Sequence, residues 1–139
     1  MPGSMMIARR IKDTVEYTHA ASKVAPVTGE LTLTGGAGAD AAGVYTEVAA
    51  SLSNKVKIES ICIYGLSAAD RYTVDIAIGA AASETVLSSV SVGGAVAASF
   101  VVPINIPTIE SGSRLAARVA SVSGGGDTCK IAINYIEVV

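Results

Sequence analysis

The side chains that could carry chemistry are few in this sequence. His19 is the only histidine, and the two cysteines, Cys62 and Cys129, stand far apart in separate apolar runs. A histidine-based catalytic triad or a multi-histidine metal site therefore cannot form within one chain. Two separated cysteines do not make a zinc knuckle. With no secretory signal visible at the N-terminus, we expect both to be small buried side chains and not a disulfide.

The carboxylates are the next candidates, and they are spread singly along the chain. Folding could bring two of them together as in a glycosidase, and sequence spacing leaves that open. We expect each carboxylate to lie on a solvated strand face or in a turn. Asp127 follows Gly124-Gly125-Gly126 and could bind a cation in a loop, but a plain turn is the stronger interpretation.

Four charged residues form local pairs in the predicted strands. Arg71 precedes Asp75, and Arg114 precedes Arg118, each four positions apart and so on one face of a strand. We interpret all four as outward positions that serve solubility or a subunit contact.

A glycine-rich stretch, LTLTGGAGADAAG at 31–43, contains Gly36-Ala37-Gly38-Ala39-Asp40-Ala41, which fits G-x-G-x-x-A, the pattern of the dinucleotide-binding turn. The alternation of Leu31 and Leu33 with threonines indicates a half-exposed strand and not the buried parallel strand that such a turn follows. The residues after it, with an early Gly43 and a Val-Tyr-Thr centre, disfavour a helix. We therefore predict a loop between strands and no cofactor.

Length and composition define the class of protein. The chain has 139 residues, half of them apolar and 16% charged, which is typical of one folded domain and excludes intrinsic disorder. A net charge of −2 with scattered basic residues gives no surface for nucleic acid. No apolar run approaches the roughly 18 residues that cross a bilayer, so we expect no membrane partner.

From Lys55 onward the sequence alternates apolar and polar residues in six short runs separated by Gly, Pro, Ser and Asp, which predicts antiparallel strands. In the first run we place Lys57, Glu59, Ile61 and Ile63 on the outer face. The residues expected to point inward are Val56, Ile58, Cys62, Tyr64, Tyr72, Val74, Ile76, Ile78, Phe100, Val102, Ile104, Ile106, Leu115, Ala117, Val119, Cys129, Ile131, Ile133 and Tyr135.

These strands predict an all-β, antiparallel, two-sheet sandwich of jelly-roll type over residues 29–139. One or two further strands between Glu30 and Ser53 bring the total to seven or eight. Pro103 cannot donate to a β-ladder, which places its strand at a sheet edge or at a bulge.

Residues 1–28 are interpreted as an N-terminal arm and linker, with the linker over 18–28. Ile7 and Ile11 share a face in either a helix or a strand, so periodicity does not choose between them. The candidate contacts of this arm with neighbouring subunits or a capsid are Ile7, Arg9, Arg10, Ile11 and Lys12.

A resemblance covers roughly residues 43–139. Its parts are a strand ending in Ile106-Pro107, a turn with Gly112-Ser113-Arg114, the run Leu115-Ala116-Ala117-Arg118, the Ser/Gly-rich hairpin 121–126 and the final strand 128–139. In these turn and strand patterns the chain resembles small virion proteins of tailed bacteriophages.

The resemblance implies a non-enzymatic structural subunit of a phage particle, assembled in the host cytoplasm. Our first expectation is a capsid decoration (cement) protein that forms a homotrimer and binds the major capsid protein. The alternatives are a tail or neck component, or a carbohydrate-binding, receptor-binding sandwich module. The last predicts exposed aromatic side chains on one face, whereas Tyr64, Tyr72, Phe100 and Tyr135 are expected to point inward. A small hydrolase would need a clustered pair of carboxylates.

Overall fold

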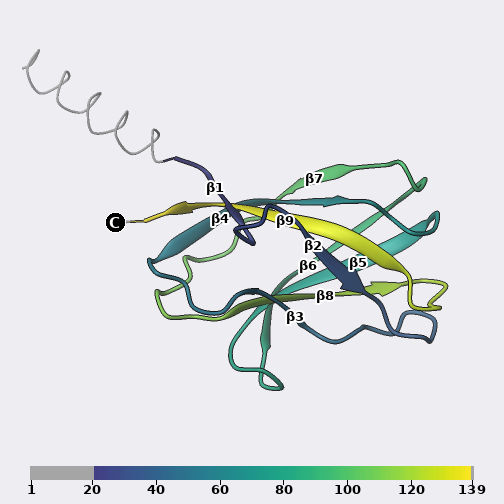
Figure 1. Cartoon of the computed structure of the whole chain (residues 1–139), viewed down its shortest axis with the longest axis horizontal. Helices are drawn as coiled ribbons and strands as arrows, with labels where there is room; N and C mark the ends of the chain where they lie inside the picture. The colour runs from purple at the N-terminus through teal and green to yellow at the C-terminus, as the bar shows by residue number, and fades with distance from the viewer. Residues whose placement is uncertain (1–20, 139) are drawn as a thin grey trace, which may run out of the picture.

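The computed structural model describes residues 21–138, which form nine β-strands and no helix (Figure 1). With no helix in these residues, none spans a membrane. The strands are β1 (Lys23–Ala25), β2 (Leu31–Thr34), β3 (Thr46–Ala49), β4 (Val56–Tyr64), β5 (Asp70–Ile78), β6 (Thr85–Gly94), β7 (Phe100–Pro103), β8 (Leu115–Ser121) and β9 (Thr128–Glu137).

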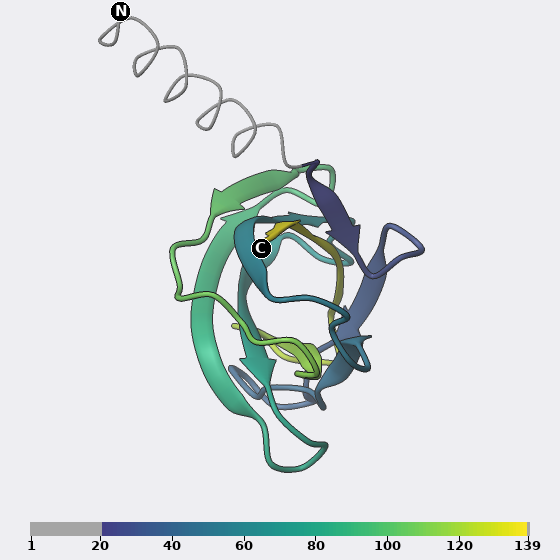
Figure 2. The same cartoon turned by 90° about the vertical axis from the view of Figure 1, so that its left-hand side faces the viewer.

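The strands form two sheets, and every strand pair is antiparallel. One sheet has the order β1-β9-β4-β7, with β2 also paired to β9, and the other has the order β3-β8-β5-β6. Figure 2 shows the two sheets curving around a common interior. The predicted all-β, jelly-roll-like sandwich is therefore confirmed, as are the six strands after Lys55.

The core lies between the two sheets and is built from β-branched and aliphatic side chains. Alternation places Tyr72, Val74 and Ile76 inward on β5, and all three are fully buried as predicted. The Tyr72 hydroxyl donates to the Ala68 carbonyl oxygen at 2.9 Å, so the one phenol in the core has its polar group satisfied. From the opposite sheet, the fully buried Ile131 and Ile133 of β9 complete this centre.

Strand β4 differs from the prediction because it contains a β-bulge. Its pairing with β9 shifts register between Ile58 and Ser60, so Glu59 is an extra residue. An extra residue reverses which side chains face the core beyond it. Ile61 and Ile63 are consequently fully buried, whereas Cys62 and Tyr64 are half-buried on the outer face. The predicted assignment of faces was correct before Glu59 and wrong after it.

The sheet edges confirm the predicted position of Pro103 and show that the predicted linker contains a strand. Pro103 ends β7, which is an edge strand of its sheet as the missing N–H requires. Lys23–Ala25, by contrast, lies in the range predicted as linker yet pairs with β9 as β1. The buried Ala25 and the ion pair between Lys23 and Glu137, at 2.6 Å, hold this strand in place. The predicted arm contacts Ile7, Arg9, Arg10, Ile11 and Lys12 lie outside the described residues.

Candidate functional site

The glycine-rich stretch is a loop between β2 and β3, as predicted, and several of its amide groups already donate to protein carbonyl groups. The Gly36 N–H donates to the Ala41 carbonyl at 2.9 Å, and the Asp40 N–H donates to the Ser121 carbonyl at 2.9 Å. In return, the Gly125 N–H donates to Ala37 at 2.8 Å. A phosphate-binding turn instead points free N–H groups at its ligand from the start of a helix. These contacts hold the β8–β9 hairpin against the loop. Close packing explains two of the glycines, because a Cβ at Gly36 would stand 2.8 Å from the Ala41 Cβ and one at Gly124 would stand 2.4 Å from the Gly38 carbonyl oxygen.

Asp127 lies in the same hairpin, near Asp70. Asp70 accepts hydrogen bonds from the side chain and the backbone N–H of Ser123, and these bonds lower the pKa of its carboxyl group. The Ser123 hydroxyl also approaches Asp127 Oδ2 at 3.4 Å. Between positions 21 and 138, no group of three or more His, Cys, Asp or Glu residues is placed to hold a metal ion.

The cysteines of the described strands are both free thiols. Cys129 is fully buried in the core, and burial raises its pKa to about 12. Cys62 lies half-buried on the outer face, where its sulfur accepts a hydrogen bond from the Asn134 amide at 3.4 Å. The expectation that both cysteines are buried therefore holds for Cys129 alone.

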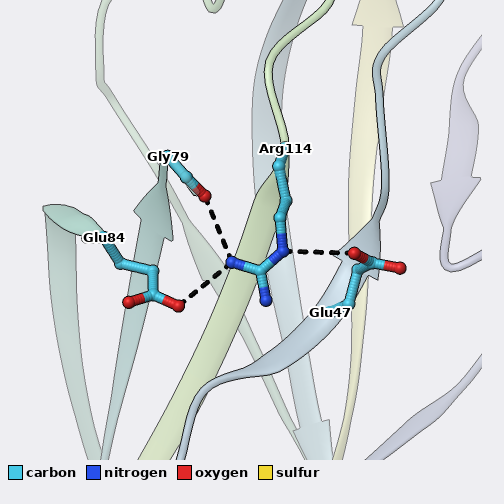
Figure 3. Close-up of polar contacts among 4 residues, drawn as sticks. All are labelled: Glu47, Gly79, Glu84 and Arg114. Atoms are coloured by element: carbon cyan, nitrogen blue, oxygen red, sulfur yellow. Dashed lines mark hydrogen bonds and ion pairs between the residues drawn. The ribbon is translucent and has the colours of Figure 1, made fainter. Parts of the chain in front are cut away.

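The densest set of polar contacts surrounds Arg114, immediately before β8 (Figure 3). Its Nε donates to Glu47 Oε1, and its Nη1 donates to both Glu84 Oε1 and the Gly79 carbonyl oxygen, each at 3.1 Å. The Gly79 N–H donates back to the Arg114 carbonyl at 3.2 Å. The Arg114 side chain is only 17% exposed and that of Glu84 only 7%. This guanidinium joins the β5–β6 turn to strands β3 and β8.

Two features of the β5–β6 turn fit this arrangement. Gly79 has φ of 118°, and a Cβ there would stand 2.9 Å from the Ser83 carbonyl, so the turn requires glycine. The Glu84 carboxyl group has a lowered pKa, first because its own backbone N–H hydrogen-bonds to it and then because Arg114 does. The turn thus presents an ionised Glu84 to the arginine.

A second arginine lies nearby on the outer face of the same sheet. Arg118 of β8 sits directly opposite Asp75 of β5, and its Nε donates to Asp75 Oδ2 at 2.8 Å. Its guanidinium carbon is 4.6 Å from the centre of the Tyr45 ring, a cation–π contact. Together these contacts raise the pKa of Arg118, the Asp75 hydrogen bond most of all. The outward orientation predicted for Arg114 and Arg118 is confirmed.

A hollow of about 350 Å³ opens between the segment before β3 and the β5–β6 turn. The sequence predicted its arginines as outward residues but did not predict the hollow. Tyr45, Ala81 and Ala82 lie in segments that connect strands, and strand periodicity does not predict where such segments are placed. The residues that line it are Gly43, Val44, Tyr45, Ala81, Ala82, Glu84, Arg114 and Arg118.

No protein-family model matches this sequence, and no curated protein matches it. Among solved structures, it is similar to the CBM36-1 domain of a multidomain xylanase from the hindgut metagenome of Trinervitermes trinervoides. The TM-score is 0.49 at 13% identity, over 86% of this chain and 98% of that domain.

Two further solved structures show weaker similarity. For Eiger TNF from S. frugiperda the TM-score is 0.42 at 9% identity, over 85% of this chain and 92% of that one. For a chain of infectious bursal disease virus, Gx strain, it is 0.35 at 12% identity, over 85% of this chain and 37% of the viral chain. These likenesses concern the sandwich fold and give no information about what this chain binds.

Proposed function

We propose that this chain is a non-enzymatic structural subunit of a tailed-bacteriophage particle, a capsid decoration protein that binds the major capsid protein. The resemblance that suggests this covers strands β3 to β9. Its turn motif ends at Arg114, which ties three elements together, and its next motif contains Arg118, which pairs with Asp75. The residues that carry the resemblance therefore have roles in holding a rigid sandwich together.

The observation that best supports a subunit role is the free edge of β6. This strand has 10 residues, TVLSSVSVGG, and pairs only with β5 in the described part of the chain. After a bulge at Leu87 its pairing is regular from Ser88 to Gly94, with no charged residue and no proline. An edge of this kind presents unpaired backbone groups on which another strand can dock.

The other edge strands carry features that discourage such pairing. Strand β7 has 4 residues and ends in Pro103, and β3 has 4 residues with a bulge after Glu47. Strand β1 has 3 residues and carries the charged Lys23, and β2, which among the described strands pairs only with β9, has 4 residues. Short length, proline, bulges and charge all block edge-to-edge association. The contrast favours β6 as the edge through which copies of this subunit associate.

The assembly we propose is a homotrimer in the virion. Pairing of β6 with itself would give a two-fold dimer, so in a closed ring of three β6 docks on a different segment of its neighbour. A tail or neck component fits the resemblance and would use the same edge, and it is the second candidate. Neither nucleic acid, nor a membrane, nor a cofactor enters this function.

Sedimentation velocity tests the self-association, with Ser91→Lys as the variant and Val101→Lys on β7 as its matched control. Ser91 and Val101 are both exposed, but only Ser91 lies on the long edge strand β6. We expect the unmodified chain and Val101→Lys to sediment as trimers and Ser91→Lys as a folded monomer. If the unmodified chain sediments as a monomer, the free edge of β6 no longer supports self-association. Co-sedimentation with purified phage heads then tests the partner.

A further inference from the structure

The hollow beside Tyr45 offers unused hydrogen-bond donors. Arg118 uses its Nε–H on Asp75, but its two terminal amino groups have no protein partner within residues 21–138. Arg114 likewise leaves its Nη2 unpaired there. No side-chain nitrogen or oxygen in the described residues is both buried and unpaired, so these amino groups remain accessible to solvent. They can donate to a ligand without first breaking a protein contact.

The charges around the hollow disfavour an anionic ligand. The two guanidinium groups of Arg114 and Arg118 are matched by the carboxylates of Glu47, Glu84 and Asp75, each within 3.1 Å of its arginine. The net charge of these five side chains is therefore slightly negative, although the free polar groups of the two arginines are hydrogen-bond donors. An uncharged ligand that is rich in oxygen acceptors fits this balance better than a carboxylate or a phosphate.

The rest of the lining is apolar and small. Val44, which is 82% exposed, lines the hollow together with Tyr45, Ala81 and Ala82. Pockets for small molecules combine such apolar walls with a few converging polar groups and span roughly 300–1,000 Å³. A volume of about 350 Å³ corresponds to a small ligand.

The hollow is also held in a fixed shape. Arg114 ties the β5–β6 turn to β3 and β8 (Figure 3), so the wall carrying Ala81, Ala82 and Glu84 cannot move independently. Ala82 adopts φ of 66°, a left-handed conformation that alanine rarely takes. Non-glycine residues held this way cluster at ligand-binding sites, because the surrounding contacts impose the conformation.

We propose that this hollow binds a neutral saccharide of one or two sugar rings. Hydroxyl oxygens accept from the free amino groups of Arg118, hydroxyl groups donate to the Glu84 carboxylate, and the C–H faces of the sugar contact Tyr45 and Val44. This inference does not depend on the proposed role in a virion. It adds a glycan-binding site to the outer face of the four-stranded sheet.

Nuclear magnetic resonance titration of the full chain tests the proposal. The probes are glucose, galactose, N-acetylglucosamine, maltose, cellobiose and lactose, each raised to about 10 mM so that Kd values in the millimolar range are detected. We expect at least one of them to shift the amide signals of Tyr45, Ala82 and Glu84 and the Nε–H signal of Arg118. Acetate and glucuronate serve as anionic comparisons and should bind no more tightly than the neutral sugars.

Variants show whether binding occurs at this hollow. Arg118→Gln should weaken the sugar about tenfold or more, the loss expected for a charge-assisted hydrogen bond. Tyr45→Ala removes the ring that contacts the sugar and should also weaken binding, which provides a second test if Arg118→Gln is poorly folded. Arg71→Gln, on the exposed side of β5 away from the hollow, should bind as the unmodified chain does.

Three results would overturn the proposal. The first is an absence of shifts with every named sugar. The second is binding that Arg118→Gln and Tyr45→Ala leave unchanged. The third is tighter binding of acetate or glucuronate than of any neutral sugar, which would make this an anion site. None of these results bears on whether the chain is part of a phage particle.

Discussion

Asp75 and Arg118 face each other across β5 and β8, and Arg118 donates to Asp75 Oδ2 at 2.8 Å while its guanidinium covers the Tyr45 ring. One side chain thereby links two strands of the sheet to the segment that leads into β3. The Asp75 side chain is 15% exposed and that of Arg118 is 33% exposed. Solvent therefore screens the pair in part, and its net effect on stability is modest.

A double-mutant cycle measures that effect. We expect Asp75→Asn and Arg118→Gln to show a coupling energy of about 0.5–1 kcal/mol in urea unfolding, the range for partly exposed ion pairs. A coupling near zero would mean that the two groups are positioned independently, with Tyr45 alone holding Arg118.

Arg114 should matter more for stability than other arginines. Arg114→Met removes three hydrogen bonds and leaves Glu84, 7% exposed, without its partner, so we expect a loss of about 2–3 kcal/mol. The matched control Arg71→Met, at an exposed position of β5, should change stability by no more than about 0.5 kcal/mol. Chemical denaturation of both variants checks this, and equal losses would contradict the anchoring role of Arg114.

The lowered pKa of Glu84 predicts that the protein loses stability at acid pH. Its folded-state pKa is lowered from 4.5, by its own backbone N–H first and by Arg114 as well. A lowered pKa means that the stabilisation is complete above pH 4.5 and is lost as the pH falls through the folded-state value. Glu84→Gln should therefore be less stable than the parent at pH 7, and this difference should shrink at low pH. A difference that stays constant with pH would contradict the ionised state of Glu84.

The bulge in β4 can be tested by truncating adjacent side chains. Ile61→Ala removes fully buried atoms and should cost about 2–5 kcal/mol, as should Ile133→Ala on β9. Cys62→Ala, one position along on the outer face, should cost less than about 1 kcal/mol. If Cys62→Ala proved the more costly change, the strand would follow plain alternation without a bulge at Glu59.

The two thiols should differ in reactivity. Burial raises the pKa of Cys129 to about 12, so almost none of it is the reactive thiolate at pH 8. Cys62 is half-buried and more accessible. Alkylation followed by mass spectrometry should label Cys62 alone in the folded chain and both cysteines in denaturant. Rapid labelling of native Cys129 would contradict its place in the core.

Alternation of apolar and polar residues was enough to predict the strands after Lys55 and the faces of β5, β8 and β9. It failed at Glu59, because a single extra residue reverses the pattern and leaves no compositional mark. It also missed β1, since Lys23–Ala25 is too short to show a period and is stabilised by β9, a strand distant in sequence.

The candidate site was harder to predict for a related reason. The pairing of Asp75 with Arg118 follows from strand register, which the sequence of each strand does not specify by itself. The hollow depends on Tyr45, Ala81 and Ala82, which lie in connecting segments shaped by contacts with Arg114 and Arg118. The signal that was available is the pair of outward arginines, Arg114 immediately before β8 and Arg118 within it.

The most direct test of the proposed function is immunogold labelling of intact, purified phage particles with antibodies raised against this chain. A capsid decoration protein predicts gold particles distributed over the whole surface of the head. Label confined to the tail or neck would contradict the decoration role, and particles without label would contradict a place in the virion altogether.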